Sequence, residues 1–285
     1  MDKILNKLHK YYLFDIIIAA IFLIIGYIMQ PFIQPYVEQF SPIITPQKLA
    51  AQLEAKNVDV KKFNEDRNKM KTEVKLESIN FKGDKQLSGI DWRSLILLNS
   101  DLTNSQLQNS NLENFQFYGD LVNANLTNSS LTNAGLNNVN LTNATLTKVN
   151  LTNSDLTDAD LAYSKLHGAD LNGSELTNAD LYHANLANAN LGYAKLNDAN
   201  LNNVNLTNAN LYSSDLTNAD LYNASLINTN LGFAQLRNAN FGSANLTNAD
   251  LGFAQLRNAD LGDADFANAS INRVDLTNAY LKEHI

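Results

Sequence analysis

A large apolar residue recurs at every fifth position from Leu121 to Leu281, and this period limits what the chain can fold into. Of these 33 positions, 30 hold Leu and the other three hold Phe241, Phe266 and Ile271. The 32 positions that lie three residues after a large residue hold 22 Ala, five Ser, four Val and one Thr. A period of five matches neither the 3.6 of a helix nor the 2.0 of a strand. The chain must therefore turn a corner every five residues to keep these leucines on one side.

The corners predict a coil with a square outline. If each pentapeptide forms one side, the Leu and the small residue point inward, and the coils stack through backbone hydrogen bonds. Four sides give a second period of twenty, and LGFAQLRNAN at 231–240 recurs as LGFAQLRNAD at 251–260. The pattern extends less regularly back to Leu87, with a local kink expected between Phe117 and Leu121, where one residue is missing. About ten coils would form a rod about 48 Å long.

The repeat resembles the pentapeptide-repeat family. The consensus A-(D/N)-L-x-x of that family is matched by Ala159-Asp160-Leu161 and Ala219-Asp220-Leu221, and the resemblance covers residues 87–281. It implies an all-β solenoid, in the form of a right-handed quadrilateral β-helix. It implies less about function, because the best understood members resemble duplex DNA and bind topoisomerases, whereas many others have no assigned role.

The N-terminal segment predicts a membrane anchor. Residues 16–29 contain no polar side chain, and with residues 11–15 they give nineteen residues, or about 28 Å of helix, close to the thickness of a hydrocarbon core. We therefore expect a cytoplasmic tail and a transmembrane helix within residues 1–30. Three lysines precede the span and only Lys48 lies in the twenty residues after it, so the positive-inside rule places the N-terminus in the cytoplasm. A cleaved signal peptide is the alternative, although no A-x-A pattern follows the apolar run.

The segment between the span and the repeat reads as a connector. Residues 31–45 contain three prolines and predict an extended stalk. Residues 46–80 predict a helical connector that caps the first coil, as one helix or as two helices broken near residues 57–59. A coiled coil is the alternative, but Arg67 interrupts its seam. Residues 81–285 would then form the β-helix, and its last coil is expected to pair with a second copy, as a homodimer, or with another protein.

Charge separates the two parts of the chain. Residues 1–100 carry 14 basic and 11 acidic side chains, and residues 101–285 carry 7 basic and 18 acidic ones. The acidic second part argues against nucleic-acid binding, which requires basic surface. It also raises the hypothesis of DNA mimicry, carried by acidic residues at multiples of twenty. This acidic ladder consists of Asp120, Asp160, Asp180, Asp220 and Asp260.

The acidic ladder also has a structural interpretation. Asn140, Asn200 and Asn240 separate most of its acids, and this spacing relieves repulsion while each position keeps a side-chain acceptor for a turn. One net charge per about 4 Å of rod is sparse beside one per about 1.7 Å in duplex DNA. The sequence therefore favours a structural role for the acidic ladder over mimicry.

The duplicated segment predicts a candidate binding surface. Stacked aromatic residues beside arginines are typical of interface hot spots. Aromatic pairs across neighbouring strands also stabilise a sheet without any partner, so the sequence favours a structural role for the stack, with partner binding as the alternative. The candidate partner-binding residues are Phe233, Phe253, Gln235, Gln255, Arg237, Arg257 and Tyr193.

Signals of catalysis are missing from the sequence. The chain has no cysteine, no phosphate-binding glycine loop and no Ser/His/Asp grouping, and His167 and His183 fall in different columns of the repeat. We expect no enzyme activity, no cofactor and no metal. The sequence predicts a membrane-anchored scaffold whose acidic rod lies in a periplasm or lumen and binds a protein partner. The alternative is a DNA-mimicking, topoisomerase-binding protein that protects or inhibits gyrase.

Overall fold

The computed structural model describes residues 44–281 except residues 56, 71–72, 80 and 82–85. Thr45–Ile285 form one compact unit. The predicted membrane span and all but the last two residues of the predicted stalk lie outside the described residues. Within the part of the chain that the structure describes, every helix is too short or too polar to cross a bilayer.

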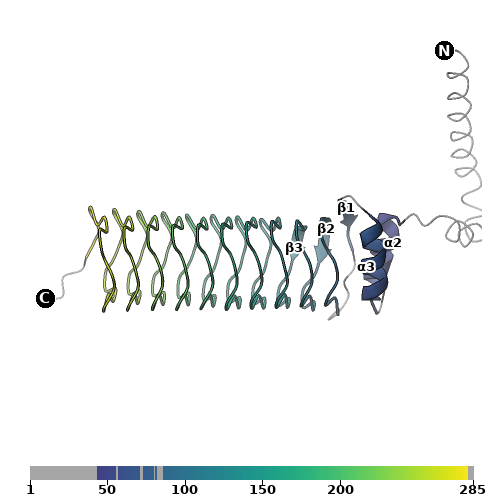
Figure 1. The fold of residues 1–285 in the computed structure, drawn as a ribbon, viewed down its shortest axis with the longest axis horizontal. Helices are drawn as coiled ribbons and strands as arrows, with labels where there is room; N and C mark the ends of the chain where they lie inside the picture. Colours follow the sequence, from purple (N-terminus) through teal and green to yellow (C-terminus); the bar gives the residue numbers. More distant parts are fainter. Residues whose placement is uncertain (1–43, 56, 71–72, 80, 82–85, 282–285) are drawn as a thin grey trace, which may run out of the picture. The chain divides into compact units, whose positions relative to one another are not determined.

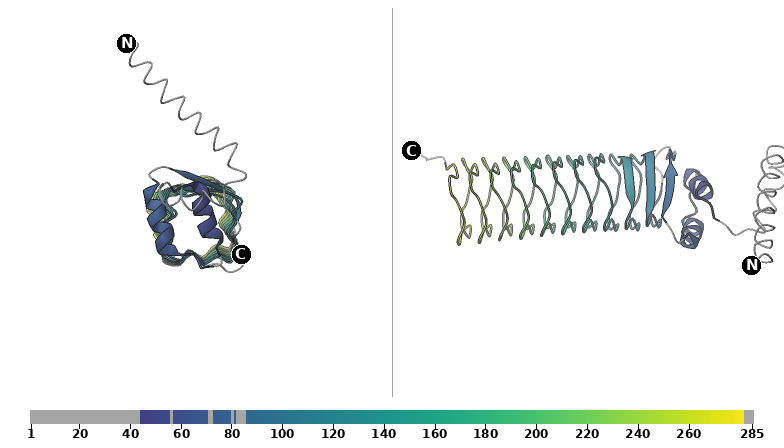
Figure 2. Two further views of the ribbon diagram at one scale, coloured as in Figure 1. Left: turned by 90° about the vertical axis from the view of Figure 1, so that its right-hand side faces the viewer. Right: turned by 90° about the horizontal axis from the view of Figure 1, so that it is seen from above.

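The repeat forms a solenoid of stacked coils, as Figure 1 shows along its length. Parallel β-bridges join residues twenty apart, from Asp120 and Asn140 through to Asp260 and Tyr280, with one bridge at every fifth residue. A coil therefore contains twenty residues and four bridge positions, and the view along the axis in Figure 2 has a square outline. The predicted period of twenty and the β-solenoid are confirmed.

The interior of the solenoid is filled by the two inward positions of each pentapeptide. The large residues from Leu121 to Leu261 are at most 3% exposed, and the small residues from Ala124 to Ala259 are buried as well. At Ser154, Ser174 and Ser214, which replace Ala, the hydroxyl donates to the carbonyl of the Leu three residues before it at 2.7 Å. The polar atoms of these three serines are thus satisfied inside an apolar core.

Each corner is a β-turn that requires an unusual backbone conformation. The N–H of the small residue donates to the Leu carbonyl three residues earlier, as Ala124 does to Leu121 at 3.0 Å. The residue before the small one has a positive φ, as at the third position of a type II turn. Among the described residues, Asn fills 22 of the 36 non-glycine positions with positive φ. Asn tolerates this left-handed region, so the abundant asparagines are a requirement of the corners.

The expected kink is a bulge in a short parallel sheet. The strands β1 (Val74–Glu77), β2 (Leu95–Asp101) and β3 (Gln116–Asp120) pair side by side in that order. The register of β2 and β3 shifts between Leu98 and Ser100, so that Ser100 pairs with Gly119. A Cβ on Gly119 would collide with the carbonyl oxygen of Ser100, so only glycine fits there. The bulge, where the two strands approach closely, therefore accommodates the repeat that is one residue short.

Strand β1 lies inside residues 46–80, a segment that the sequence predicted to be helical. Val74 and Leu76 are buried, whereas Lys75 and Glu77 are exposed, which is the alternation of a strand. The strand pairs in parallel with β2, so strand pairing begins before residue 81. Val74 also continued the helical spacing of the residues before it, which is why the sequence pattern extended the helix too far.

Two helices lie across the end of the coil stack (Figures 1 and 2). They are α2 (Pro46–Glu54) and α3 (Val60–Lys69), so the two-helix alternative is correct. The Thr45 hydroxyl accepts a hydrogen bond from the N–H of Lys48 at 3.3 Å and begins α2. The Asp59 carboxylate accepts from the N–H of Lys62 at 2.9 Å and begins α3.

A buried carboxylate joins the two helices. Asp66 of α3 is fully buried and accepts a hydrogen bond from Gln52 of α2 at 2.8 Å. Lys62 and Lys69 lie 3.0 and 3.2 Å from the same carboxylate. Burial alone would raise the pKa of Asp66, but these hydrogen bonds and the Lys62 charge outweigh it and lower the pKa below 3.8.

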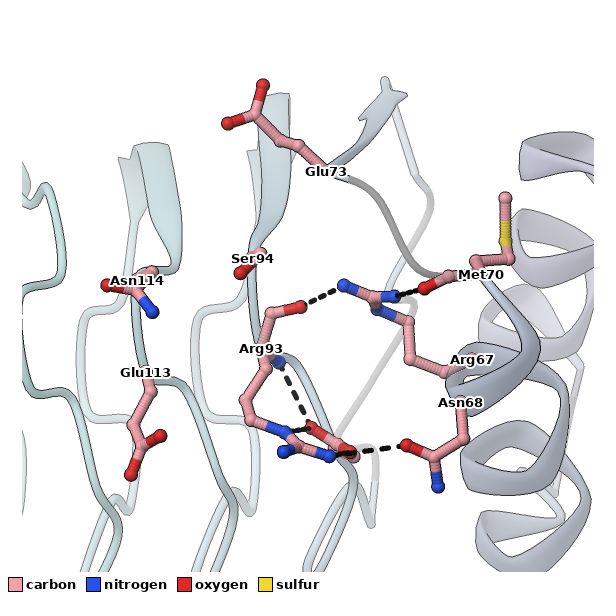
Figure 3. A pocket seen from close by; sticks show the side chains of 9 residues that line it. Arg67, Asn68, Met70, Glu73, Arg93, Ser94, Glu113 and Asn114 are labelled. Atoms are coloured by element: carbon pink, nitrogen blue, oxygen red, sulfur yellow. Dashed lines mark hydrogen bonds and ion pairs between the residues drawn. The ribbon is translucent and has the colours of Figure 1, made fainter.

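Helix α3 supplies the hydrogen bonds that a preceding coil would otherwise make. Asn64 donates to the carbonyl of Gly89 at 3.0 Å and accepts from the N–H of Asp91 at 2.8 Å. The Arg67 guanidinium donates to the carbonyl of Arg93, as Figure 3 shows. Phe63 adds an apolar contact, with its ring centroid 6.3 Å from that of Trp92. The helix thus satisfies the backbone edge of the first coil and covers its interior.

The opposite end of the described solenoid is open. Ile271, Leu276 and Leu281 occupy inward positions but are 56%, 39% and 58% exposed. Tyr280 is 58% exposed as well. Apolar side chains that are covered in every earlier coil are therefore accessible in the last described one.

Replacing Arg67 by Met should loosen the first coil and leave distant coils intact. The substitution keeps the apolar stem but leaves buried carbonyls without a donor, which costs about 1–3 kcal/mol. Because each coil contacts only its neighbours, hydrogen exchange should accelerate in residues 86–106 and stay unchanged beyond residue 200. Asn68→Ala is the matched control, since it removes one exposed hydrogen bond to Arg93. Equal exchange in both variants, or acceleration along the whole rod, would contradict this account of the cap.

Candidate functional site

The two duplicated phenylalanines form a stack on the surface. The ring centroids of Phe233 and Phe253 lie 4.7 Å apart with 5° between the ring planes. The residues are 48% and 43% exposed. The structure therefore brings the predicted pair together in an exposed position.

Tyr193 joins this stack through a residue that the sequence analysis missed. Ser213 fills the position between Tyr193 and Phe233 in the predicted column. Tyr212 closes this gap, with ring centroids 5.9 Å from Tyr193 and 5.5 Å from Phe233. Tyr212 stands one position before the predicted column, so the twenty-residue spacing alone did not indicate it.

Arginines border the aromatic stack. Arg237 donates to the side-chain oxygen of Gln255, and Arg257 Nε lies 2.5 Å from an Asp275 carboxylate oxygen. Hydrogen bonds from Thr277 and Arg257 lower the pKa of Asp275 to about 2. The sequence analysis also missed Arg273, whose guanidinium carbon lies 5.3 Å from the Phe253 ring centroid.

We group these residues, which lie in or beside the aromatic column and in the columns two and four residues further along the chain, as the aromatic–arginine ridge. It comprises Tyr193, Tyr212, Phe233, Phe253, Gln235, Gln255, Arg237, Arg257 and Arg273.

Several ridge residues occupy strained backbone positions. Tyr193, Phe233, Phe253 and Arg273 all occupy corner positions with φ between 57° and 60°, where Asn is the usual residue. A bulky side chain in this region costs about 1–2 kcal/mol. An aromatic pair returns about 0.5–1.5 kcal/mol, so stacking does no more than offset the strain. Fold stability alone therefore gives no reason to place aromatic rings at these corners.

The acidic ladder forms as predicted but uses its carboxylates within the fold. Consecutive β-bridges connect its positions from Asp120 to Asp260. Asp160 accepts a hydrogen bond from the N–H of Ala162, and Asp180 accepts one from the N–H of Tyr182, both at 2.9 Å. Such Asx turns brace the corners.

The same bracing extends to Asp220 and Asp260. Asp220 and Asp260 accept from the N–H groups two residues later at 3.1 and 2.9 Å. Asn200 and Asn240 each donate to the preceding acid at 2.8 Å. The ladder occupies a column separate from the ridge, and its contacts support a role in the turns.

A cavity of about 400 Å³ lies where α3 meets the first coils (Figure 3). Burial lowers the pKa of Arg67. Arg93 and Asp91 form an ion pair at 2.5 Å. Glu73 and Glu113 add acidic groups to the wall. The cavity therefore has mixed charge that is largely compensated, and among the described residues no three potential ligands come together to hold a metal.

Comparison with protein families identifies the repeat. The family model described as Pentapeptide repeats matches eight copies. The matched residues are 120–158, 154–192, 184–221, 205–242, 219–263 and 244–282. Comparison with curated proteins finds no match to the chain.

Several solved structures are similar to the chain. One is HetL, a pentapeptide repeat protein involved in heterocyst differentiation regulation from the cyanobacterium Nostoc sp. strain PCC 7120. It is 26% identical, with a TM-score of 0.42, over 74% of this chain and 88% of HetL. A pentapeptide repeat protein from the Arabidopsis thaliana thylakoid lumen is 29% identical, with a TM-score of 0.29, over 37% of this chain and 60% of that one. QnrB1, a plasmid-mediated fluoroquinolone resistance protein, is 17% identical, with a TM-score of 0.26, over 75% and 91% of the two chains.

Two substitutions at Asp180 should separate the acceptor role of the acidic ladder from its charge. Asp180→Asn keeps an oxygen for the N–H of Tyr182 and removes repulsion with Asp160, so its free energy of unfolding should equal that of the wild type or exceed it by less than about 1 kcal/mol. Asp180→Ala removes the acceptor and should cost about 1 kcal/mol. Urea denaturation followed by circular dichroism measures both. Equal losses in the two variants would show that the negative charge itself is required.

Proposed function

The chain belongs to the pentapeptide-repeat family, and on that premise we propose that it is a membrane-anchored, non-enzymatic scaffold that binds a protein partner. Its rod, which we infer to be a right-handed quadrilateral β-helix, would display the aromatic–arginine ridge as the docking surface. The observation that carries the proposal is the exposure of stacked aromatic rings at corners that favour Asn.

The rigidity of the solenoid supports this role. Backbone hydrogen bonds tie every coil to the next, as between Phe233 and Gly252 at 2.9 Å, so the ridge is held in place before a partner arrives. A preorganised surface loses little conformational entropy on binding. Exposed aromatic rings beside arginines match the composition of interface hot spots.

The location of the rod is the second part of the proposal. The apolar run at residues 16–29 and the lysines before it support a single N-terminal span with the repeat in a periplasm or lumen. The DNA-mimicking alternative needs a cytoplasmic repeat, where topoisomerases act. The engagement of the acidic ladder in turns supports the scaffold over mimicry.

Self-association through the last coil is the third part of the proposal. The exposed inward side chains of Ile271, Leu276 and Leu281 support the expected pairing with a second copy of the chain. Such a homodimer would leave the aromatic stack, which lies in earlier coils, available to another protein.

Replacing both Phe233 and Phe253 by Asn should abolish partner binding without weakening the fold. Asn is the residue that these corners favour, so the thermal midpoint should stay equal to that of the wild type or rise. Loss of two hot-spot side chains should reduce capture of the partner at least about tenfold. The measurement is affinity capture with the full-length chain from detergent-solubilised membranes, read by quantitative mass spectrometry.

Tyr163→Asn provides the matched control. Tyr163 is also aromatic, exposed and at a positive-φ corner, but it lies ten positions away around the coil from the ridge column. Its replacement should leave the captured protein unchanged. A double variant that captures the same protein as the wild type, or that unfolds at a lower temperature with no change in capture, would make the ridge a purely structural element.

A reporter fused to the C-terminus should be active outside the cytoplasm and inactive inside it. Alkaline phosphatase, which requires an oxidising compartment, and a fluorescent protein that folds only in the cytoplasm give opposite readouts. Fusions to a chain in which acidic residues replace the lysines before the apolar run test the cause, because the positive-inside rule predicts a loss of orientation. Cytoplasmic activity of the unaltered fusion would overturn the proposed location and favour the topoisomerase-binding alternative.

A further inference from the structure

The charge of the aromatic–arginine ridge is opposite to that of the rest of the rod. Residues 101–285 contain 18 acidic and 7 basic side chains. All three arginines of this region, Arg237, Arg257 and Arg273, lie in the ridge. The sequence places basic side chains where the aromatic rings are stacked.

Two of these arginines keep their charge available. Within the described residues, Arg257 forms an ion pair with Asp275, whereas the contacts of Arg237 and Arg273 are to the neutral groups of Gln255 and Phe253. The two guanidinium groups are therefore not neutralised by a carboxylate of the described chain. An incoming carboxylate would gain a charge-assisted hydrogen bond from either group.

The stacking of the rings favours the same kind of ligand. Phe233 and Phe253 cover one another, Arg273 lies over the Phe253 ring, and Tyr212 contacts Phe233 at an angle of 61°. The faces of the two phenylalanine rings are therefore largely covered. Ring edges carry partial positive charge and attract anionic oxygens, whereas ring faces attract cations. A sugar ring or a cationic ligand, which would require open faces, fits this surface poorly.

We propose that the aromatic–arginine ridge binds an acidic protein segment that carries both carboxylates and aromatic side chains. This inference rests on the proposed scaffold function and names the chemistry of its partner. Carboxylates of the segment would contact Arg237 and Arg273, and its aromatic side chains would pack beside Tyr193 and the phenylalanine pair.

The charge of the remaining surface adds specificity. An acidic segment is repelled by the rod as a whole, so only the ridge offers a favourable approach. Repulsion elsewhere fixes both the position and the orientation of the partner. A basic partner would instead be attracted to many faces of the rod and would gain nothing from the arginines.

The test uses four defined probes against the full-length chain in neutral detergent. They are a random copolymer of glutamate and tyrosine, polyglutamate, a copolymer of lysine and tyrosine, and single-stranded oligothymidylate. Biolayer interferometry should give the tightest binding for the glutamate–tyrosine copolymer, weaker binding for polyglutamate, and a steep loss of affinity with added salt.

The variants Arg237→Gln and Arg273→Gln, combined, should weaken binding of the glutamate–tyrosine copolymer at least tenfold. Both side chains are on the surface, and circular dichroism should show an unchanged fold. Lys165→Gln is the control, because it removes one positive charge in a column eight positions around the coil from those of Arg237 and Arg273. The control variant should bind the copolymer as the wild type does.

Several results would overturn the inference. They are equal binding of the lysine–tyrosine copolymer, preferential binding of the oligonucleotide, or equal losses in the control and the arginine variants. The proposed function is judged separately by partner capture with the Phe233→Asn and Phe253→Asn variant. If the wild type captures a basic protein and this variant does not, the acidic-segment inference is wrong but the scaffold function is supported. If the variant captures the same protein as the wild type, both proposals are wrong.

Discussion

The structure depends on a corner that must be turned four times in each coil. The inward Leu and the small residue three positions later can both face the interior only if the residue directly before the small one adopts a positive φ. Asn meets this condition through its tolerance of the left-handed region, and where Asn or Asp precedes the Leu its side chain can brace the next turn, as Asn125 does for the N–H of Thr127 at 3.1 Å. Local backbone chemistry, repeated about forty times, thus sets the shape of the whole rod.

In a stack of identical coils, the backbone groups that lack hydrogen-bond partners are at the two ends. Every coil satisfies the backbone of the next, so the first coil lacks partners for its carbonyl and N–H groups. Helix α3 meets this need with side chains, since Asn64 and Arg67 contact backbone groups of Gly89, Asp91 and Arg93. A helix can replace a strand edge here because long polar side chains reach where its own backbone, already hydrogen-bonded internally, cannot.

The sequence predicted the features that repeat and missed those that do not. The inward positions, the twenty-residue coil, the Phe233–Phe253 pair and the ladder from Asp120 follow from spacing alone. Tyr212 was missed because it stands one position before the predicted column, and spacing does not record the direction of a side chain. Arg273 lies twenty residues after Phe253, so the spacing contained its signal, although Arg273 falls outside the duplicated segment. Strand β1 was missed because four residues are too short to separate a period of 2.0 from one of 3.6.

The aromatic–arginine ridge places large side chains at several corners where Asn is the usual residue. At Tyr193, Phe233 and Phe253 an aromatic side chain is attached to a strained backbone. Stacking of the rings offsets this strain but adds no net stability. Duplication explains why the second phenylalanine copies the first, but it does not explain Arg273, which lies outside the duplicated ten residues and still contacts the stack. Strain is retained at functional surfaces when it places a side chain where a partner needs it. The ridge meets that condition because its corners hold Tyr193, Phe233, Phe253 and Arg273 in one column.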